Sequence, residues 1–198
     1  MCIRDSTEVL AEAGMEYSDL DAVVTGVGPG PFTGLRVGMA TASALADALS
    51  IPLHGICTHD AIAAAADLHV EPAAAADEAT ALVATDARRK EIYWATYRAT
   101  DSGVQRISGP AVTKPAELEV ELASTAEVII PDRLAGQLPE RFAALPHRAA
   151  HPTASALVAA ADLEAEPAPV VPLYLRRPDA VPPKQQQQLS TAIPKVEL

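Results

Sequence analysis

Glycine and proline residues at positions 28–34 form the segment of this sequence whose chemistry is easiest to interpret. They follow an apolar run and precede a helical pattern, a junction where free backbone N–H groups and the helix dipole often bind phosphate groups. Pro29 and Pro31 remove two of those donors, and Thr33 stands where the GxGxxG pattern needs its third glycine. The spacing therefore favours a turn that delivers a helix to a sheet, with nucleotide binding as the alternative. We predict this structural loop role for Gly28, Gly30, Phe32, Thr33, Gly34 and Arg36.

Histidine and cysteine residues are the other candidates for chemistry. His147 and His151 have the i,i+4 spacing of a helical metal site, but Pro146 and Pro152 bracket them and disfavour a helix there. His54 and His59 are interpreted as satisfied or solvated histidines. The two cysteines lack the CxxC spacing of a redox or zinc site, and the sequence has no GxSxG nucleophile elbow. We therefore predict no catalytic, cofactor-binding or metal-binding residue, and no cofactor.

A helical pattern follows the loop at residues 33–50, with Thr33 as the expected N-cap and Pro52 as the stop. Winding it at ~100° per residue gives one bulkier face that suits packing on a sheet. That face consists of Leu35, Met39, Ala42, Ala46 and Leu49. The opposite face has small side chains and permits close approach of another helix, which belongs either to a partner or to this same chain. We predict a partner-binding face made of Val37, Ala40, Thr41, Ala44 and Ala48.

Charge and hydropathy exclude two functional classes. The chain has 198 residues and a formal net charge of -11, which opposes binding to a phosphate backbone by this protein alone. No apolar run is long enough for a membrane span, and residues 1–6 lack the start of a signal peptide. We expect a cytoplasmic protein without membrane contact.

The coarse pattern predicts two α/β units. Residues 22–27 and 53–58 are expected to form buried parallel strands around the helix at 33–50, with a helix end at 7–14 before them and a helix at 61–68 after them. Strands at 81–85, 91–99 and 104–108 predict an antiparallel meander, followed by a helix at 114–124, a strand at 127–130 and a helix at 153–162. We expect a first domain at 1–70, a linker at 71–80, a second smaller α/β domain at 81–175 and a polar, disordered tail at 176–198.

Five blocks of the sequence together resemble a known family. They are residues 28–38 with 40–42, then 51–53, 86–93 and 172–176. In this order they look like TsaB, the dimerisation subunit of the bacterial complex that forms threonylcarbamoyladenosine in tRNA. The resemblance implies an actin-like, ribonuclease H-like α/β fold and a non-catalytic subunit. It also implies that the chain binds and stabilises TsaD, the catalytic paralogue, with a TsaE-like ATPase in the same complex and tRNA bound only through that complex.

Two departures from the family pattern affect this interpretation. The opening β-hairpin and strand of the family are absent, so we expect the first domain to be truncated at its N-terminus. In the catalytic paralogue a His-x-x-x-His pair follows the Pro-Leu strand, whereas this sequence has His59 and then Ala63. An actin-like enzyme acting alone, as an ATP-dependent phosphotransferase or metallopeptidase, is the alternative function. Homodimerisation through the helix at 33–50 is the alternative to a heteromeric partner.

Overall fold

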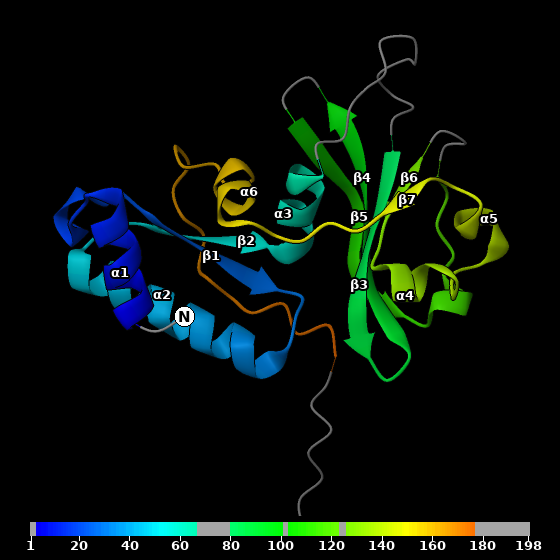
Figure 1. The fold of residues 1–198 in the computed structure, drawn as a ribbon, viewed down its shortest axis with the longest axis horizontal. Helices are drawn as coiled ribbons and strands as arrows, with labels where there is room; N and C mark the ends of the chain where they lie inside the picture. Colours follow the sequence, from blue (N-terminus) through cyan, green and yellow to red (C-terminus); the bar gives the residue numbers. More distant parts are fainter. Residues whose placement is uncertain (1–2, 67–79, 101–102, 123–125, 177–198) are drawn as a thin grey trace, which may run out of the picture.

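The computed structural model describes residues 3–66, 80–100, 103–122 and 126–176, which form two sheets with helices packed around them (Figure 1). The small sheet pairs β1 (Val23–Gly28) with β2 (Leu53–Cys57) in parallel. The larger sheet has the order β5-β4-β3-β6-β7. The expected linker at 71–80 lies outside the described residues except for Thr80, where β3 begins. The expected tail lies outside them from residue 177 onward.

The first unit has the predicted strand, helix and strand order. It consists of α1 (Ile3–Ala13), the short 3₁₀ helix η1 (Tyr17–Asp19), β1, α2 (Phe32–Leu49), β2 and α3 (Thr58–Ala65). Gly14 closes α1 with a φ of 68°, a left-handed conformation that favours glycine, as the sequence predicted. The expected helix at 61–68 is shifted, because α3 already begins at Thr58 directly after β2.

The start of α2 differs from the prediction. Pro31 occupies the N-cap position, with φ -60° and ψ 125°, and no side chain caps the helix. The N-cap prediction for Thr33 was wrong because Phe32 already has helical geometry, which places Thr33 in the first turn. At the other end, Ser50 adopts a left-handed φ of 54°, and its N–H bonds to carbonyls of the last turn.

The meander is confirmed as three long antiparallel strands. They are β3 (Thr80–Arg88), β4 (Glu91–Thr100) and β5 (Gly103–Thr113). The turn between β3 and β4 is unusual, because Arg88, Arg89 and Lys90 all have positive φ, at 64°, 51° and 62°. β6 (Glu127–Ile129) adds in parallel to β3, and β7 (His147–Arg148) adds to β6.

The predicted helix at 114–124 was wrong. Only a short 3₁₀ helix, η2 (Pro115–Glu117), forms there, and residues 118–122 have no regular helix. Leu118 is buried, and Val120 and Leu122 pack against the same core. These apolar residues alternate with glutamates at every second position, which is the period of an extended chain rather than of a helix.

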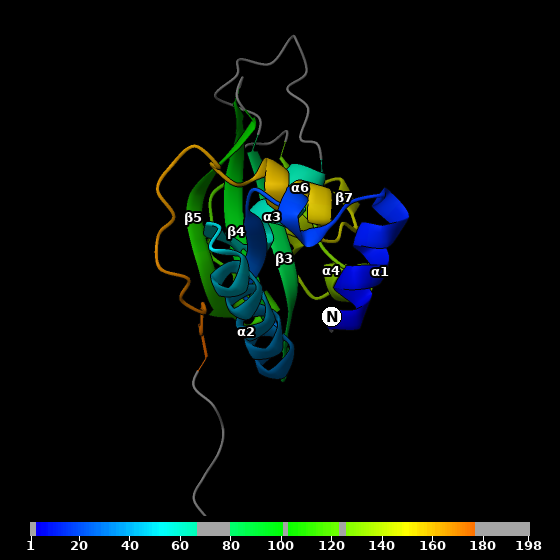
Figure 2. The same cartoon turned by 90° about the vertical axis from the view of Figure 1, so that its left-hand side faces the viewer.

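Two short helices were not predicted, and a third is shorter than expected. α4 (Asp132–Ala135) and α5 (Glu140–Ala143) each follow a proline and bury Leu134 and Phe142. α6 (Ala154–Ala159) is capped by the Thr153 hydroxyl, which accepts the N–H of Ala156 at 3.1 Å. α6 packs mainly against α3 and β1, and Figure 1 and Figure 2 both show α6 beside α3.

The core lies on both faces of the larger sheet. Leu82 on β3 points into a cluster with Ile130 and Phe142, whereas its neighbour Val83 points into a second cluster with Ile62 and Tyr97. This alternation is the period-two pattern of a strand buried on both faces. No helix among the described residues is both long and apolar enough to cross a membrane.

Candidate partner-binding surface

The inward face of α2 is the one predicted from the helical winding. Met39, Ala42 and Ala46 are buried, and Leu35 and Leu49 are half-buried. The helix packs with this face on β1 and β2, so its orientation is fixed by its larger apolar side chains.

The opposite face of α2 stays open to solvent among the described residues. Val37 is 51% exposed, and Ala40, Ala44 and Ala48 are also exposed. Thr41 is half-buried, and its hydroxyl donates to the Val37 carbonyl at 2.8 Å, which satisfies the side chain within the helix. The structure therefore brings these predicted residues onto one solvent-accessible face of α2.

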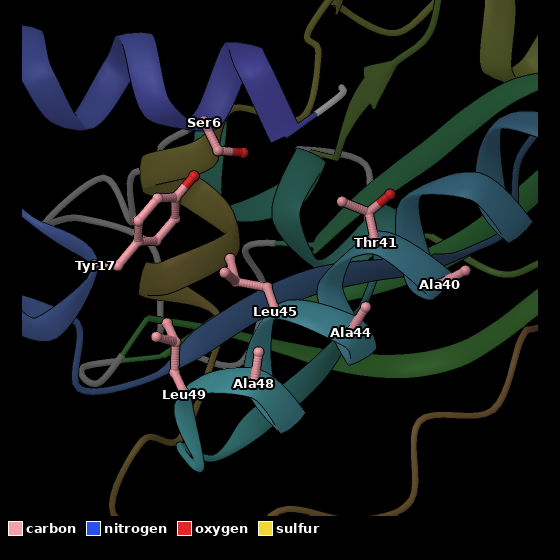
Figure 3. A pocket seen from close by; sticks show the side chains of 8 residues that line it. All are labelled: Ser6, Tyr17, Ala40, Thr41, Ala44, Leu45, Ala48 and Leu49. Carbon is pink, nitrogen blue, oxygen red and sulfur yellow. The ribbon is translucent and has the colours of Figure 1, made fainter.

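A groove of about 560 Å³ runs along this face, between α2 and the segment that carries α1 and η1 (Figure 3). Its α2 wall includes most of the predicted face together with Leu45, and Ser6 and Tyr17 form the opposite wall. Leu49, which the winding assigns to the inward face, also lines the groove, because it lies at the edge between the two faces in the last turn of α2. A hydrogen bond of 3.0 Å between the hydroxyls of Thr7 and Tyr17 connects α1 to η1. Ser6 and Tyr17 were missed from the sequence because their contribution depends on how α1 is placed in space. Leu45 could have been assigned to this face from the sequence, because it lies four residues after Thr41 and so on the same side of the helix.

The loop before α2 is held by packing contacts. Gly28 has a φ of 98°, and a Cβ on it would lie 3.2 Å from Leu35 Cδ2. The Phe32 ring meets the Tyr174 ring edge to face at 5.2 Å. Arg36 donates from Nε to the Tyr174 hydroxyl at 2.8 Å, with its guanidinium 5.3 Å from the ring centroid. The loop thus joins the start of α2 to the C-terminal described segment, whose Leu173 N–H donates to the Val27 carbonyl at 2.8 Å.

The remaining predicted loop residues have simpler surroundings. A Cβ on Gly30 or on Gly34 would meet no atom within 4 Å. Thr33 is exposed on the first turn of α2. Their structural loop role remains a prediction.

The polar groups buried near α3 form a structural network. His59 is fully buried, and its Nε2 hydrogen-bonds with the Thr85 hydroxyl at 2.9 Å. Burial, with a smaller contribution from Arg106, lowers the pKa of His59 to about 3. The Tyr97 hydroxyl donates to Asp60 at 2.7 Å, and Arg106 lies 3.5 Å from the same carboxylate. These bonds attach α3 to strands β3, β4 and β5.

The cysteine and histidine candidates have no shared site. Burial raises the pKa of the Cys57 thiol, so it stays protonated at neutral pH. His147 is exposed in β7, and His151 is exposed after it. The helix that would present both rings on one face does not form, and the described part of the chain contains no group of three side chains suited to a metal ion.

Comparison with known proteins gives the family. A family model described as "TsaD: tRNA N6-adenosine threonylcarbamoyltransferase" matches residues 6–161. An uncharacterized protein of Mycobacterium leprae is 48% identical over 87% of this chain and 43% of its own length. The protein of Escherichia coli named tRNA threonylcarbamoyladenosine biosynthesis protein TsaB is 33% identical over 52% of this chain and 46% of its own length. The chain thus spans less than half of each of these two relatives.

A solved structure agrees with the sequence relatives. The crystal structure of a Pseudomonas aeruginosa protein, described as similar to peptidase YeaZ, superimposes with a TM-score of 0.68. It is 26% identical, and the match covers 86% of this chain and 81% of that chain. The predicted fold class is confirmed, since the fold is that of the actin-like, ribonuclease H-like α/β proteins. Within that class, the chain belongs to the tRNA N6-adenosine threonylcarbamoyltransferase family and is a homologue of TsaB.

Proposed function

We propose that this chain is a non-catalytic subunit in the synthesis of threonylcarbamoyladenosine in tRNA, and that it binds and stabilises a TsaD-like catalytic subunit. The observation that carries the proposal is the solvent-exposed, small-residue face of α2, which the described residues leave uncovered beside an apolar groove. The role in threonylcarbamoyladenosine synthesis is inferred from the names of the chain's relatives. A TsaE-like ATPase joins the same complex, and the chain binds tRNA only as part of that complex.

The surface has the features of a helix-packing interface. Alanines at three positions of the face allow a second backbone to approach closely, and Val37 adds exposed apolar area next to them. The side chains of Leu45 and Leu49 in the groove wall are half-buried, so a partner helix packed on them would remove further apolar surface from water. Exposed apolar surfaces of this kind commonly mark protein–protein contacts.

The non-catalytic part of the proposal rests on the surroundings of the family's metal position. His59 lies in the core with its Nε2 bonded to Thr85, and Ala63 lies four residues later on α3. A metal ligand must present its nitrogen lone pair to an accessible site. The buried ring is instead used to attach α3 to β3.

The substitution Ala44→Arg tests the interface. Ala44 is exposed, so the monomer has room for the new side chain, whereas a partner backbone packed on this face does not. Overpacking costs ~1 to 3 kcal/mol before the desolvated charge of the arginine is counted, so the affinity for a TsaD-like subunit should fall by about tenfold or more. The affinity is measured by calorimetric titration of the partner.

The matched control is Ala159→Arg, which makes the same change at an exposed position of α6, away from the groove. Its affinity should equal that of the wild type, and both variants should keep the wild-type melting temperature. Unchanged partner affinity in a folded Ala44→Arg protein contradicts the assigned interface. Loss of a homodimer with no effect on the heteromeric complex would instead assign the face to a second copy of this chain.

A further inference from the structure

Cationic side chains gather at one cleft of this otherwise acidic protein. The cleft, about 270 Å³, lies between the loop before α2 and the β3–β4 turn, and we call it the hairpin cleft. Its lining residues are Gly30, Pro31, Phe32, Asp86, Ala87, Arg88, Arg89, Tyr93 and Arg176. Figure 1 shows the β3–β4 turn at the same end of the molecule as the start of α2.

Four separate segments supply the charge around the hairpin cleft. The turn contributes Arg88 and Arg89 to the lining and carries Lys90 next to them, and the C-terminal segment contributes Arg176. Arg36 comes from α2 through its contact with Phe32, and Arg133 comes from α4 through its bond to Asp86. Six cationic residues thus lie in or beside the cleft, whereas the whole chain has a net charge of -11.

Both carboxylates at the cleft already have cationic partners. Asp86 bonds to Arg133 at 2.9 Å and accepts the Arg88 N–H at 2.7 Å. Glu91 bonds to Arg176 at 2.6 Å. The ion pairs of these two carboxylates are thus made with Arg133 and Arg176, which lie outside the turn.

Aromatic rings lie beside this charge. Tyr174 is 41% exposed and stacks with the Arg36 guanidinium, and Phe32 packs against its edge. Arginine forks pair with phosphate oxygens, and exposed aromatic rings and arginine planes stack on unpaired bases. An acidic peptide would use the charge but not the rings. The cleft is also smaller than most pockets that enclose a small molecule, at ~300 to 1,000 Å³, which disfavours an enclosed mononucleotide.

We propose that the hairpin cleft and the β3–β4 turn beside it form an RNA contact, in which Arg88 and Lys90 bind phosphates of the tRNA backbone while the catalytic partner holds the rest of the tRNA. The inference rests on the proposed function, and it concerns a different surface from the groove on α2. Because the rest of the chain is acidic, the cleft supplies only part of the binding energy, and the chain alone binds tRNA weakly.

The test is the double substitution Arg88→Asn with Lys90→Asn. Both residues have positive φ, and asparagine is the non-glycine residue that tolerates this conformation best, so the turn should keep its shape. The control is Gln105→Glu with Ser155→Glu, which changes the net charge equally at exposed positions of β5 and α6, away from the turn. Each protein is combined with the catalytic subunit, and an unmodified tRNA transcript is titrated by fluorescence anisotropy over a series of salt concentrations.

The double variant should bind tRNA about tenfold more weakly at ~0.1 M salt, and its slope of log K against log salt should be smaller by about 1.4 to 1.8. The control should match the wild type. An intact complex with unchanged affinity and slope overturns the RNA contact and leaves the proposed function standing. Loss of the complex in the double variant also overturns it, because the cleft is then a protein contact.

Two further measurements separate the remaining outcomes. ATP and AMP are titrated against each complex, and nucleotide binding that the double variant loses while keeping its tRNA affinity overturns the RNA assignment in favour of a mononucleotide. Failure of the wild type to form the complex contradicts the proposed function instead. In that case the same tRNA titration on the chain alone at low salt decides whether the cleft binds RNA.

Discussion

Acid should destabilise this protein through His59. The ring is fully buried on α3, where Nε2 bonds to Thr85 and Nδ1 has no described hydrogen-bond partner. Protonation would therefore place a charged donor in the core without an acceptor. Burial, and to a lesser degree Arg106, lowers the pKa of His59 from 6.5 to about 3.

The sign of the effect follows from this pKa. Between pH 6.5 and about 3 the unfolded chain binds a proton at His59 that the folded chain does not. The stabilisation is thus complete above pH 6.5 and is lost as the pH falls toward 3. Each pH unit in that window costs about 1.4 kcal/mol, so moving from about pH 7.5 to about pH 5 should lower the free energy of unfolding by roughly 2 kcal/mol.

Urea unfolding at a series of pH values measures this loss. The sequence has a single tryptophan, Trp94 on β4, whose fluorescence reports on the larger sheet. The comparison variant is His59→Gln, which can keep a bond to Thr85 but does not titrate. Between these pH values the free energy of unfolding of His59→Gln should fall by roughly 2 kcal/mol less than that of the wild type. Equal pH dependence in both proteins would refute the assignment of the loss to His59.

Metal analysis and calorimetry on this chain should find no stoichiometric zinc or iron and no micromolar ATP binding, because Ala63 provides no second imidazole and Pro29 and Pro31 provide no N–H donors. Gel-shift titration at physiological salt should show negligible tRNA binding by the chain alone, and strong binding alone would contradict the role of the partner. Gly109→Ala should lower the free energy of unfolding by ~1 to 3 kcal/mol in urea titration, because φ is 85° there and the new Cβ would lie 2.7 Å from the Trp94 carbonyl.

The parts of the fold that depend on the local spacing of apolar residues could be predicted from the sequence. Met39, Ala42 and Ala46 are spaced for one helix face, and that face is the buried one. The alternation at Leu118, Val120 and Leu122 indicates an extended segment, yet the surrounding glutamates and leucines have high helix propensity and led to a helix prediction. Packing on the core overrides propensity there.

The parts that depend on distant contacts were not predictable. Thr33 has the side chain of an N-cap, but the Phe32 ring packs on Tyr174, far away in sequence, and the helix begins one residue before Thr33. Tyr17 joins the groove only because α1 and η1 pack opposite α2. The positive charge at the hairpin cleft was hidden for the same reason, since the basic run at 88–90 is short and Arg36 and Arg176 are distant from it in the chain.

The two proposed surfaces use different parts of α2, and this separation has a functional consequence. The groove is lined by α2 side chains from Ala40 to Leu49, whereas the hairpin cleft is reached from Phe32 and Arg36 in the first turns. Arg36 and Ala44 are about 12 Å apart along the helix axis. We therefore expect a partner packed over Ala44 and a tRNA bound at the cleft to contact α2 about two turns apart. Ala44→Arg should then weaken assembly with the partner, while substitutions in the β3–β4 turn should weaken tRNA binding by a complex that still forms.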